Sequence, residues 1–276
     1  MKHFITIQEK SLPKMQTATS WKHGSATFDT FSITSFSPQV SQNMIVTEKF
    51  IYIHLHKSAG TFVNRFVNLY FPNNQTIGYH FPARYIPEQY AALPIIGCVR
   101  NPWDFYISWY FFQLQKKHSN PLFMATSKAK TLDFNATMER LLSLNDNIPL
   151  LNQILTQLPD HFVASGMNIP RSILGRLHGS SLGLYSFLYQ WMYADAPTEP
   201  QLAKTEELQE SLIAVLLKSG VSISSEMSHF LQRKEHENTS EHSHYAQYYS
   251  QEIRDRVAQL DQLVVNKHGY RFNGAG

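Results

Sequence analysis

The sequence predicts a single α/β domain with a central parallel β-sheet flanked by helices. Residues 49–70 and 93–117 each pass from an apolar strand through a short turn into a helical pattern. Strand–turn–helix units of this kind build parallel sheets. The stretches 205–219 and 247–267 add an amphipathic helix and a closing helix. At 276 residues the chain can bury one large core, and no evident linker divides it.

The first unit reads KFIYIHLHKSAGTF over residues 49–62. Its β-branched and aromatic residues predict a strand over 49–56, and a turn follows at residues 58–60. Apolar residues then recur at helical spacing and predict one buried helix face, formed by Phe62, Phe66, Leu69 and Tyr70.

The second unit begins with a buried strand over Ile95–Val99. Pro102 suits the first turn of a helix, and Asp104 favours the positive end of the helix dipole. Lys116 and Lys117 suit the far end of that helix.

The rest of the chain is less regular. Residues 1–46 are rich in Ser, Thr and Gln and read as an N-terminal extension, with a short strand or two, packed on the main domain of residues 47–276. Helical patterns recur near 134–144 and 182–193.

Composition narrows the cellular setting. Hydrophobic residues make up 43% and charged residues 16%, which is ordinary for a soluble globular protein. A net charge of +3 is too small to argue for a nucleic-acid partner. The single cysteine, Cys98, excludes an internal disulfide framework and indicates a reducing compartment. Without an apolar run of about 18–20 residues or an apolar N-terminal signal, we expect a cytoplasmic protein with no membrane partner.

The turn after the first strand has the chemistry of a phosphate-binding loop. Unpaired N–H groups at a helix start form an anion site, and the small Ser58 and Ala59 leave room for oxygens. Gly60 allows close approach of the backbone, Lys57 adds a positive charge and Thr61 a hydroxyl donor. The alternative is a tight turn with a surface lysine.

This loop differs from the Walker A loop of ATP hydrolases. A Walker A loop reads G-x-x-x-x-G-K-[ST], with its lysine after the last glycine. Here Lys57 precedes Gly60, and the strand IIGCV does not end in the aspartate of a Walker B strand. A Mg-ATP hydrolase or nucleotide kinase of the P-loop type is therefore disfavoured.

Taken together, the two units resemble the sulfotransferases that use 3′-phosphoadenosine 5′-phosphosulfate (PAPS). HKSAGTF resembles their 5′-phosphosulfate loop, which reads close to P-K-S-G-T-T-W in cytosolic members and H-K-T-G-G-T in carbohydrate-type members. RNPWDFYIS resembles their R-x-P…S motif for the 3′-phosphate, with Arg100 and Ser108 eight residues apart. AKTEELQESL is similar to the R-T-E-N-L segment, although Lys204 replaces its arginine and leaves the third 3′-phosphate contact open.

The resemblance implies a P-loop-like sulfotransferase fold and a metal-free transfer of a sulfuryl group. Lys57 and residues 58–61 would hold the 5′-phosphosulfate, and Arg100 with Ser108 the 3′-phosphate. Phe62, at the position of the motif's tryptophan, would either stack on adenine or belong to the core. His80 lies between the motifs, where related enzymes place their catalytic histidine, and imidazole suits a general base. His56 is expected to shape the loop, and no carboxylate base lies between Lys57 and Pro87.

Several alternatives stay open at this stage. The acceptor is either a carbohydrate or a small molecule, modified at oxygen or nitrogen. A nucleotide-binding protein that has lost catalysis would keep the same motifs. His236, His242 and His244 could be drawn as a zinc site, but their polar surroundings favour a solvated loop. Aromatic residues at 109–112 and 184–193 read mainly as core.

Overall fold

The computed structural model describes residues 4–6, 32–34, 44–78, 80–160, 169–232 and 242–272. Its strands are β1 (Phe4–Thr6), β2 (Ser32–Thr34), β3 (Met44–Val46), β4 (Ile51–Ile53), β5 (Gln75–Gly78), β6 (Ile95–Val99) and β7 (Gln201–Lys204). Its α-helices are α1 (Gly60–Tyr70), α2 (Pro102–Gln115), α3 (Pro121–Thr126), α4 (Phe134–Leu142), α5 (Ile148–Leu155), α6 (Arg171–Leu174), α7 (Leu184–Tyr193), α8 (Leu208–Lys218), α9 (Ser225–Gln232), α10 (Gln251–Leu260) and α11 (Gln262–His268).

Short 3₁₀ helices connect several of these elements. They are η1 (Ala83–Tyr85), η2 (Glu88–Tyr90), η3 (Gly175–Leu177), η4 (Thr205–Glu207) and η5 (Tyr245–Gln247). The strand predicted over 49–56 is shorter than expected, because the chain leaves the sheet after Ile53 and enters the loop.

The main sheet has five strands in the order β5-β3-β4-β6-β7 and is mixed. β4 and β6 run parallel, as predicted, and β7, which was not predicted as a strand, pairs parallel with β6. β3 is antiparallel to both β4 and β5. The prediction of a central parallel sheet is therefore wrong for β3 alone, because β5, antiparallel to β3, runs in the same direction as β4. Residues 47–50 form a tight turn between β3 and β4, in which the Thr47 hydroxyl donates to Phe50 O at 2.9 Å. A connection this short permits only antiparallel pairing.

β3 lies within the predicted N-terminal extension, yet its three residues are buried in the main sheet. β1 and β2 pair antiparallel in a separate two-stranded sheet. Residues 1–46 thus hold three strands where a strand or two was expected, one of them in the main sheet, and the other residues of 1–43 lie outside the described ranges.

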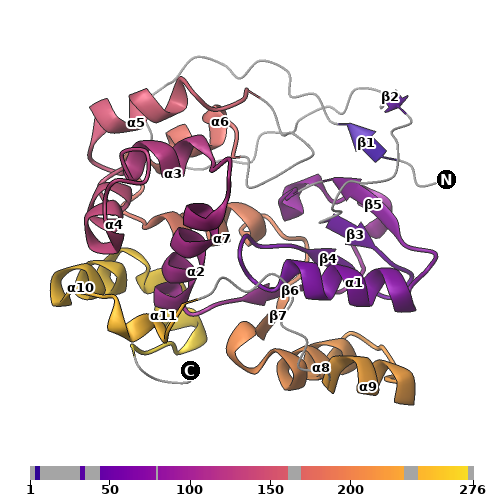
Figure 1. Ribbon diagram of the computed structural model, residues 1–276. Helices are drawn as coiled ribbons and strands as arrows, with labels where there is room; N and C mark the ends of the chain where they lie inside the picture. Colours follow the sequence, from indigo (N-terminus) through magenta and orange to yellow (C-terminus); the bar gives the residue numbers. More distant parts are fainter. Residues whose placement is uncertain are drawn as a thin grey trace.

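Helices cover both faces of the main sheet (Figure 1). On one face α1, α8 and α9 pack over Tyr52, Ile96 and Cys98. On the other, α2 and α7 pack over Ile51 and Ile53, with α3–α6, α10 and α11 extending the same core. Neighbouring residues of β4 thus point into different cores, as a strand buried on both faces requires.

Most predicted helices are present, but the buried side of α1 differs in part from the predicted one. α2, α4, α7 and α8 match the predicted ranges within a few residues. In α1 the buried stripe is Phe62, Val63, Phe66 and Val67. Leu69 was predicted to be buried but is 58% exposed, since the stripe follows the sheet and leaves that side of the last turn to solvent.

The predicted closing helix over 247–267 is two helices. α10 ends at Leu260 and α11 begins at Gln262, with Asp261 between them at φ −102° and ψ 20°. The buried Asp261 carboxylate accepts hydrogen bonds from the Tyr106 hydroxyl and from Ser186 N, both at 2.7 Å. These two bonds pull the chain into the core and interrupt the helix.

Among the described helices, none combines the length and apolar character that crossing a membrane requires.

Candidate functional site

The two sequence motifs lie side by side at the carboxyl ends of the inner strands β4 and β6. Each follows a parallel strand: β4 leads into Lys57 and β6 into Arg100. After β4 the chain turns towards β5 at one side of the sheet, and after β6 it continues to β7 at the other. Ligands of open α/β sheets bind at such a switch in strand order, beyond the carboxyl ends of the strands. Arg100 Nη1 donates to Lys57 O at 3.2 Å and joins the two turns directly.

The loop before α1 is held in an uncommon backbone conformation. Lys57 and Ala59 both have φ 56°, in the left-handed region. Ser58 N donates to Leu55 O at 3.3 Å, so that amide is used within the loop. Among the described residues, no backbone carbonyl accepts from the amides of Ala59 or Gly60. The amides of Ala59 and Gly60 can therefore contribute to the predicted anion site, whereas the amide of Ser58 is already used within the loop.

Gly60 is needed for packing against a histidine. A Cβ at this position would overlap the His54 ring. The predicted close approach of Gly60 to an anionic ligand stays a prediction, and the group that the structure places against Gly60 is the His54 side chain.

The Lys57 ammonium lies 3.7 Å from the centre of the Phe112 ring, and the Lys116 ammonium lies 4.3 Å from the same centre. Among the described residues no carboxylate pairs with either lysine. Burial, together with the charges of Arg100 and Lys116, lowers the pKa of Lys57 from 10.5 to about 7. Lys57 thus has no carboxylate partner among the described residues and loses its proton near pH 7, and an anionic ligand at the loop would favour its charged form.

Arg100 is anchored on one side. Its Nε pairs with Asp104 Oδ2 at 2.7 Å, one turn along α2. With Nη1 bonded to Lys57 O, its Nη2 has no partner among the described residues. Ser108, the second predicted contact, is 4% exposed on the buried side of α2. No described hydrogen bond joins it to Arg100.

Three histidines stack beside the loop. The His56 and His80 rings are 3.7 Å apart and nearly parallel, and the His54 ring is 4.6 Å from that of His80. His80 Nδ1 lies 3.0 Å from His54 O. A carbonyl only accepts, so Nδ1 carries the proton and Nε2 is the unprotonated, accepting nitrogen of the ring.

Burial lowers the pKa of His80 to about 4, although its bond to His54 O opposes the shift. The pKa values of His54 and His56 also fall well below 6.5, through burial first and then through the neighbouring charges of the cluster. All three rings are therefore neutral at pH 7. Both ring nitrogens of the buried His56 lack a hydrogen-bond partner among the described residues, which is costly unless a ligand or water supplies one.

Tyr185 was not singled out from the sequence, where it reads as part of an aromatic core helix. Its hydroxyl accepts from Arg100 N at 2.7 Å and lies 3.3 Å from Ser58 Oγ. Glu206 lies in the AKTEELQESL segment but was given no role there, and it accepts from Asn101 N at 2.6 Å and from the Tyr270 hydroxyl at 3.2 Å. No local pattern marks Tyr185 as part of the site, because the partners of its hydroxyl lie tens of residues away.

The structure bears on two alternatives from the sequence, the role of Phe62 and a zinc site formed by histidines. Phe62 is 7% exposed and packs against Phe230, with ring centres 5.4 Å apart, which favours the core interpretation over adenine stacking. Of the three histidines drawn as a zinc site, His236 lies outside the described residues. Within the described ranges, no three His, Cys, Asp or Glu side chains are grouped as metal ligands.

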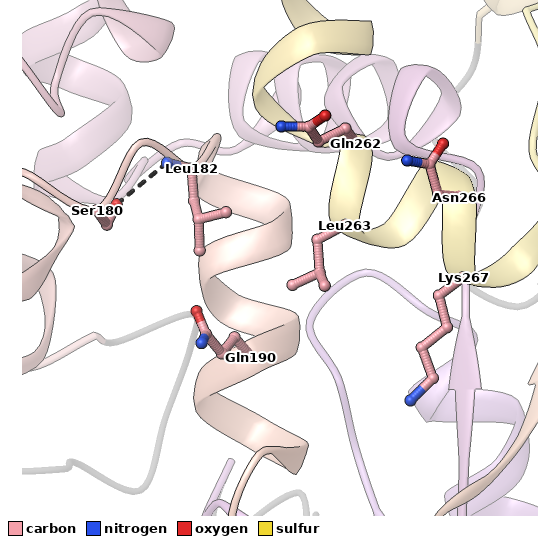
Figure 2. A pocket seen from close by; sticks show the side chains of 7 residues that line it. All are labelled: Ser180, Leu182, Gln190, Gln262, Leu263, Asn266 and Lys267. Atoms are coloured by element: carbon pink, nitrogen blue, oxygen red, sulfur yellow. Dashed lines mark hydrogen bonds between the residues drawn. The ribbon is translucent and has the colours of Figure 1, made fainter. Parts of the chain in front are cut away.

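A surface depression of about 580 Å³ lies elsewhere, between α7 and α11 (Figure 2). It is lined by Ser180, Leu182, Gln190, Gln262, Leu263, Asn266 and Lys267. None of these residues belongs to the two motifs, so the depression does not identify the acceptor side of the Lys57 site.

No protein-family model, curated protein or solved structure matches this chain. The family resemblance therefore rests on the two motifs and on the site that their residues form.

Proposed function

We propose that the protein is a PAPS-dependent sulfotransferase, which transfers a sulfuryl group to a hydroxyl or amine of a carbohydrate or small molecule. One observation carries the proposal: the two motifs occupy adjacent turns at the switch in strand order, joined by the bond from Arg100 to Lys57 O. A nucleotide with phosphates at both its 5′ and 3′ positions can contact both turns at once.

The residues of the first turn fit the 5′ end of such a donor. Lys57 supplies a basic side chain that has no acidic partner among the described residues. The first backbone amides of α1 lie next to Lys57 in the chain and add the positive end of a helix dipole to the same loop. When bound, the donor supplies an activated sulfuryl group, whose S–O bond to phosphate breaks as the acceptor atom attacks sulfur. Lys57 then stabilises the charge on the departing phosphate oxygens.

The residues of the second turn fit the 3′ end less completely. Arg100 Nη2 is suited to a charge-assisted bond with a phosphate oxygen. Ser108, buried in α2, reaches a phosphate only if its rotamer or the helix shifts. Arg100 is therefore assigned the main 3′-phosphate contact.

We assign His80 as the general base that removes the proton from the acceptor group. Its tautomer leaves Nε2 as the accepting atom, and its low pKa keeps the ring neutral at pH 7. A neutral imidazole is the form that a general base needs. A bound anionic donor stabilises the imidazolium that forms, because opposite charges raise a histidine pKa.

The first test is calorimetric titration of the protein with 3′-phosphoadenosine 5′-phosphate (PAP), AMP and Mg-ATP in parallel. Tight binding of PAP with much weaker binding of AMP supports the proposal. A preference for Mg-ATP would replace it with a nucleotide kinase, and equal affinity for PAP and AMP would remove the Arg100 assignment.

A His80→Ala substitution separates catalysis from binding. Once an acceptor is found by screening with radiolabelled PAPS, we expect the variant to keep PAP affinity within about threefold while turnover falls by about 10²-fold or more. Unchanged turnover would show that another group takes the proton. If wild-type protein binds PAP yet transfers to no acceptor, the inactive nucleotide-binding alternative would gain support.

A further inference from the structure

A buried tyrosine connects the two turns of the candidate site. Arg100 N donates to the Tyr185 hydroxyl at 2.7 Å, and that hydroxyl lies 3.3 Å from Ser58 Oγ. Ser58 Oγ in turn lies 3.3 Å from His56 O. One phenol oxygen thus spans from the strand of the 3′-phosphate motif to the loop of the 5′-phosphate motif.

The direction of these bonds follows from donor and acceptor chemistry. Arg100 N–H can only donate and His56 O can only accept. The Tyr185 hydroxyl, having accepted from Arg100, donates its proton to Ser58 Oγ, and the Ser58 hydroxyl donates to His56 O. Each proton is used once. Burial also raises the pKa of Tyr185, which keeps its hydroxyl protonated.

The phenol is itself held in place. The Tyr185 side chain is fully buried, and its ring stacks on Phe105 with centres 4.1 Å apart. Its backbone N lies 3.3 Å from the Tyr106 hydroxyl, which bonds to Asp261. The start of α7 therefore gives the two turns a rigid common support.

We propose that Tyr185 is a positioning residue that sets the separation of the two phosphate-binding turns and so selects nucleotides carrying both a 5′- and a 3′-phosphate. This inference rests on the proposed function. A ligand that engages both turns gains affinity only when their separation is fixed beforehand, because flexible turns must be ordered on binding. A nucleotide with a single phosphate contacts only one turn, so its affinity does not depend on the separation of the two turns.

The test is a Tyr185→Phe substitution, which keeps the ring and removes the hydroxyl. We expect PAP affinity to fall about tenfold, the effect of one buried hydrogen bond, while the affinities for 5′-AMP and 3′-AMP stay within about twofold of wild type. Tyr193→Phe is the matched control. Tyr193 lies on the same helix, and its buried hydroxyl donates to Ile53 O at 3.2 Å without touching either turn. We expect it to bind all three nucleotides as wild type does.

Each outcome decides the inference. A Tyr185→Phe protein that binds PAP as tightly as wild type, or that loses all three nucleotides equally, would overturn it. If wild-type protein shows no preference for PAP over AMP, the proposed function itself is contradicted. The wild-type titration is therefore done before any variant is made. If Tyr185→Phe does not fold, as judged by circular dichroism and thermal melting, Ser58→Ala removes the same bond from its other end. The same selective loss of PAP affinity is then expected, and its absence counts against Tyr185.

Discussion

Lys57, Ala59 and His80 all hold left-handed backbone conformations without being glycine. Each such residue costs about 1–3 kcal/mol, and strain of this kind is concentrated at binding and catalytic sites. All three lie in or beside the loop before α1, and the other described examples are Lys128, Ala129, Lys130 and Ser181. Strain at Lys57, Ala59 and His80 is thus compatible with a loop shaped for a ligand, although connecting turns of this chain also carry such residues.

If the protein binds nucleotides as proposed, the lowered pKa of Lys57 should make that binding depend on pH. With a pKa of about 7, Lys57 is mostly neutral at pH 8 in the free protein, and an anion at the loop restores its charge. We expect PAP binding at pH 8 to take up close to one proton and to weaken as the pH rises further. Titration in buffers of different ionisation enthalpy measures this uptake.

A Lys57→Met variant is the control for that experiment, with weaker PAP binding and no proton uptake expected. The same shift affects stability. A lysine pKa that is lower in the folded state than in the unfolded one means that stability rises with pH from about 7 towards 10.5. Identical binding enthalpies in all buffers at pH 8 would contradict the assignment of an uncharged Lys57.

Arg100 decides discrimination between nucleotides if it holds the 3′-phosphate. Arg100→Ala should lower PAP affinity about 10- to 100-fold, the loss of a charge-assisted contact, and leave AMP affinity nearly unchanged. Competition of both nucleotides against a fluorescent analogue measures the ratio. Arg176→Ala, on η3 outside the motifs, is the control, and a parallel loss of AMP binding would indicate a structural role for Arg100.

At the scale of elements, the break between α10 and α11 shows how a buried polar residue overrides helix periodicity. The sequence over 247–267 has a continuous helical pattern, but Asp261 is fully buried and bonded to α2 and α7. Burial raises its pKa to about 6. The carboxylate thus ties three helices together, and α7 is the helix that carries Tyr185.

Removing that carboxylate should destabilise the protein. Asp261→Ala leaves the Tyr106 hydroxyl and Ser186 N buried without an acceptor, and we expect a loss of about 3 kcal/mol in the free energy of unfolding. Urea denaturation at pH 7.5 measures it. Asp255→Ala, at an exposed ion pair on α10, should cost less than about 1 kcal/mol. Equal effects of the two substitutions would refute a special role for Asp261.

At the scale of the whole molecule, the sheet separates two cores and keeps its middle strands away from water. Cys98 lies in β6, is fully buried, and its pKa is raised to about 12 by burial and by the nearby Glu206. Glu206 also joins the start of α2 to the C-terminal Tyr270. β6 is therefore covered by helices α1, α8 and α9 on the face of Cys98, and Glu206 connects the turn after β6 to the C-terminal segment.

Cys98 should consequently report on global opening. We expect a thiol reagent at pH 8 to modify the folded protein only at the rate of unfolding, and to modify one thiol per chain at once in guanidinium chloride. The absorbance of the released thiolate follows the reaction. Rapid modification without denaturant would mean that β6 opens locally.

The sequence by itself determined the α/β class, the two strand–turn–helix units, the positions of most helices and the chemistry of the residues around Lys57 and Arg100. These features are local: periodicity, capping and turn residues act within a few positions of one another. The tertiary structure alone decided that β3 runs antiparallel to its neighbours, that Ser58 faces Tyr185 through its hydroxyl, that Ser108 is buried, and that Asp261 divides the last helix. Each of these depends on contacts between segments tens of residues apart, and no local pattern encodes the partner at that distance.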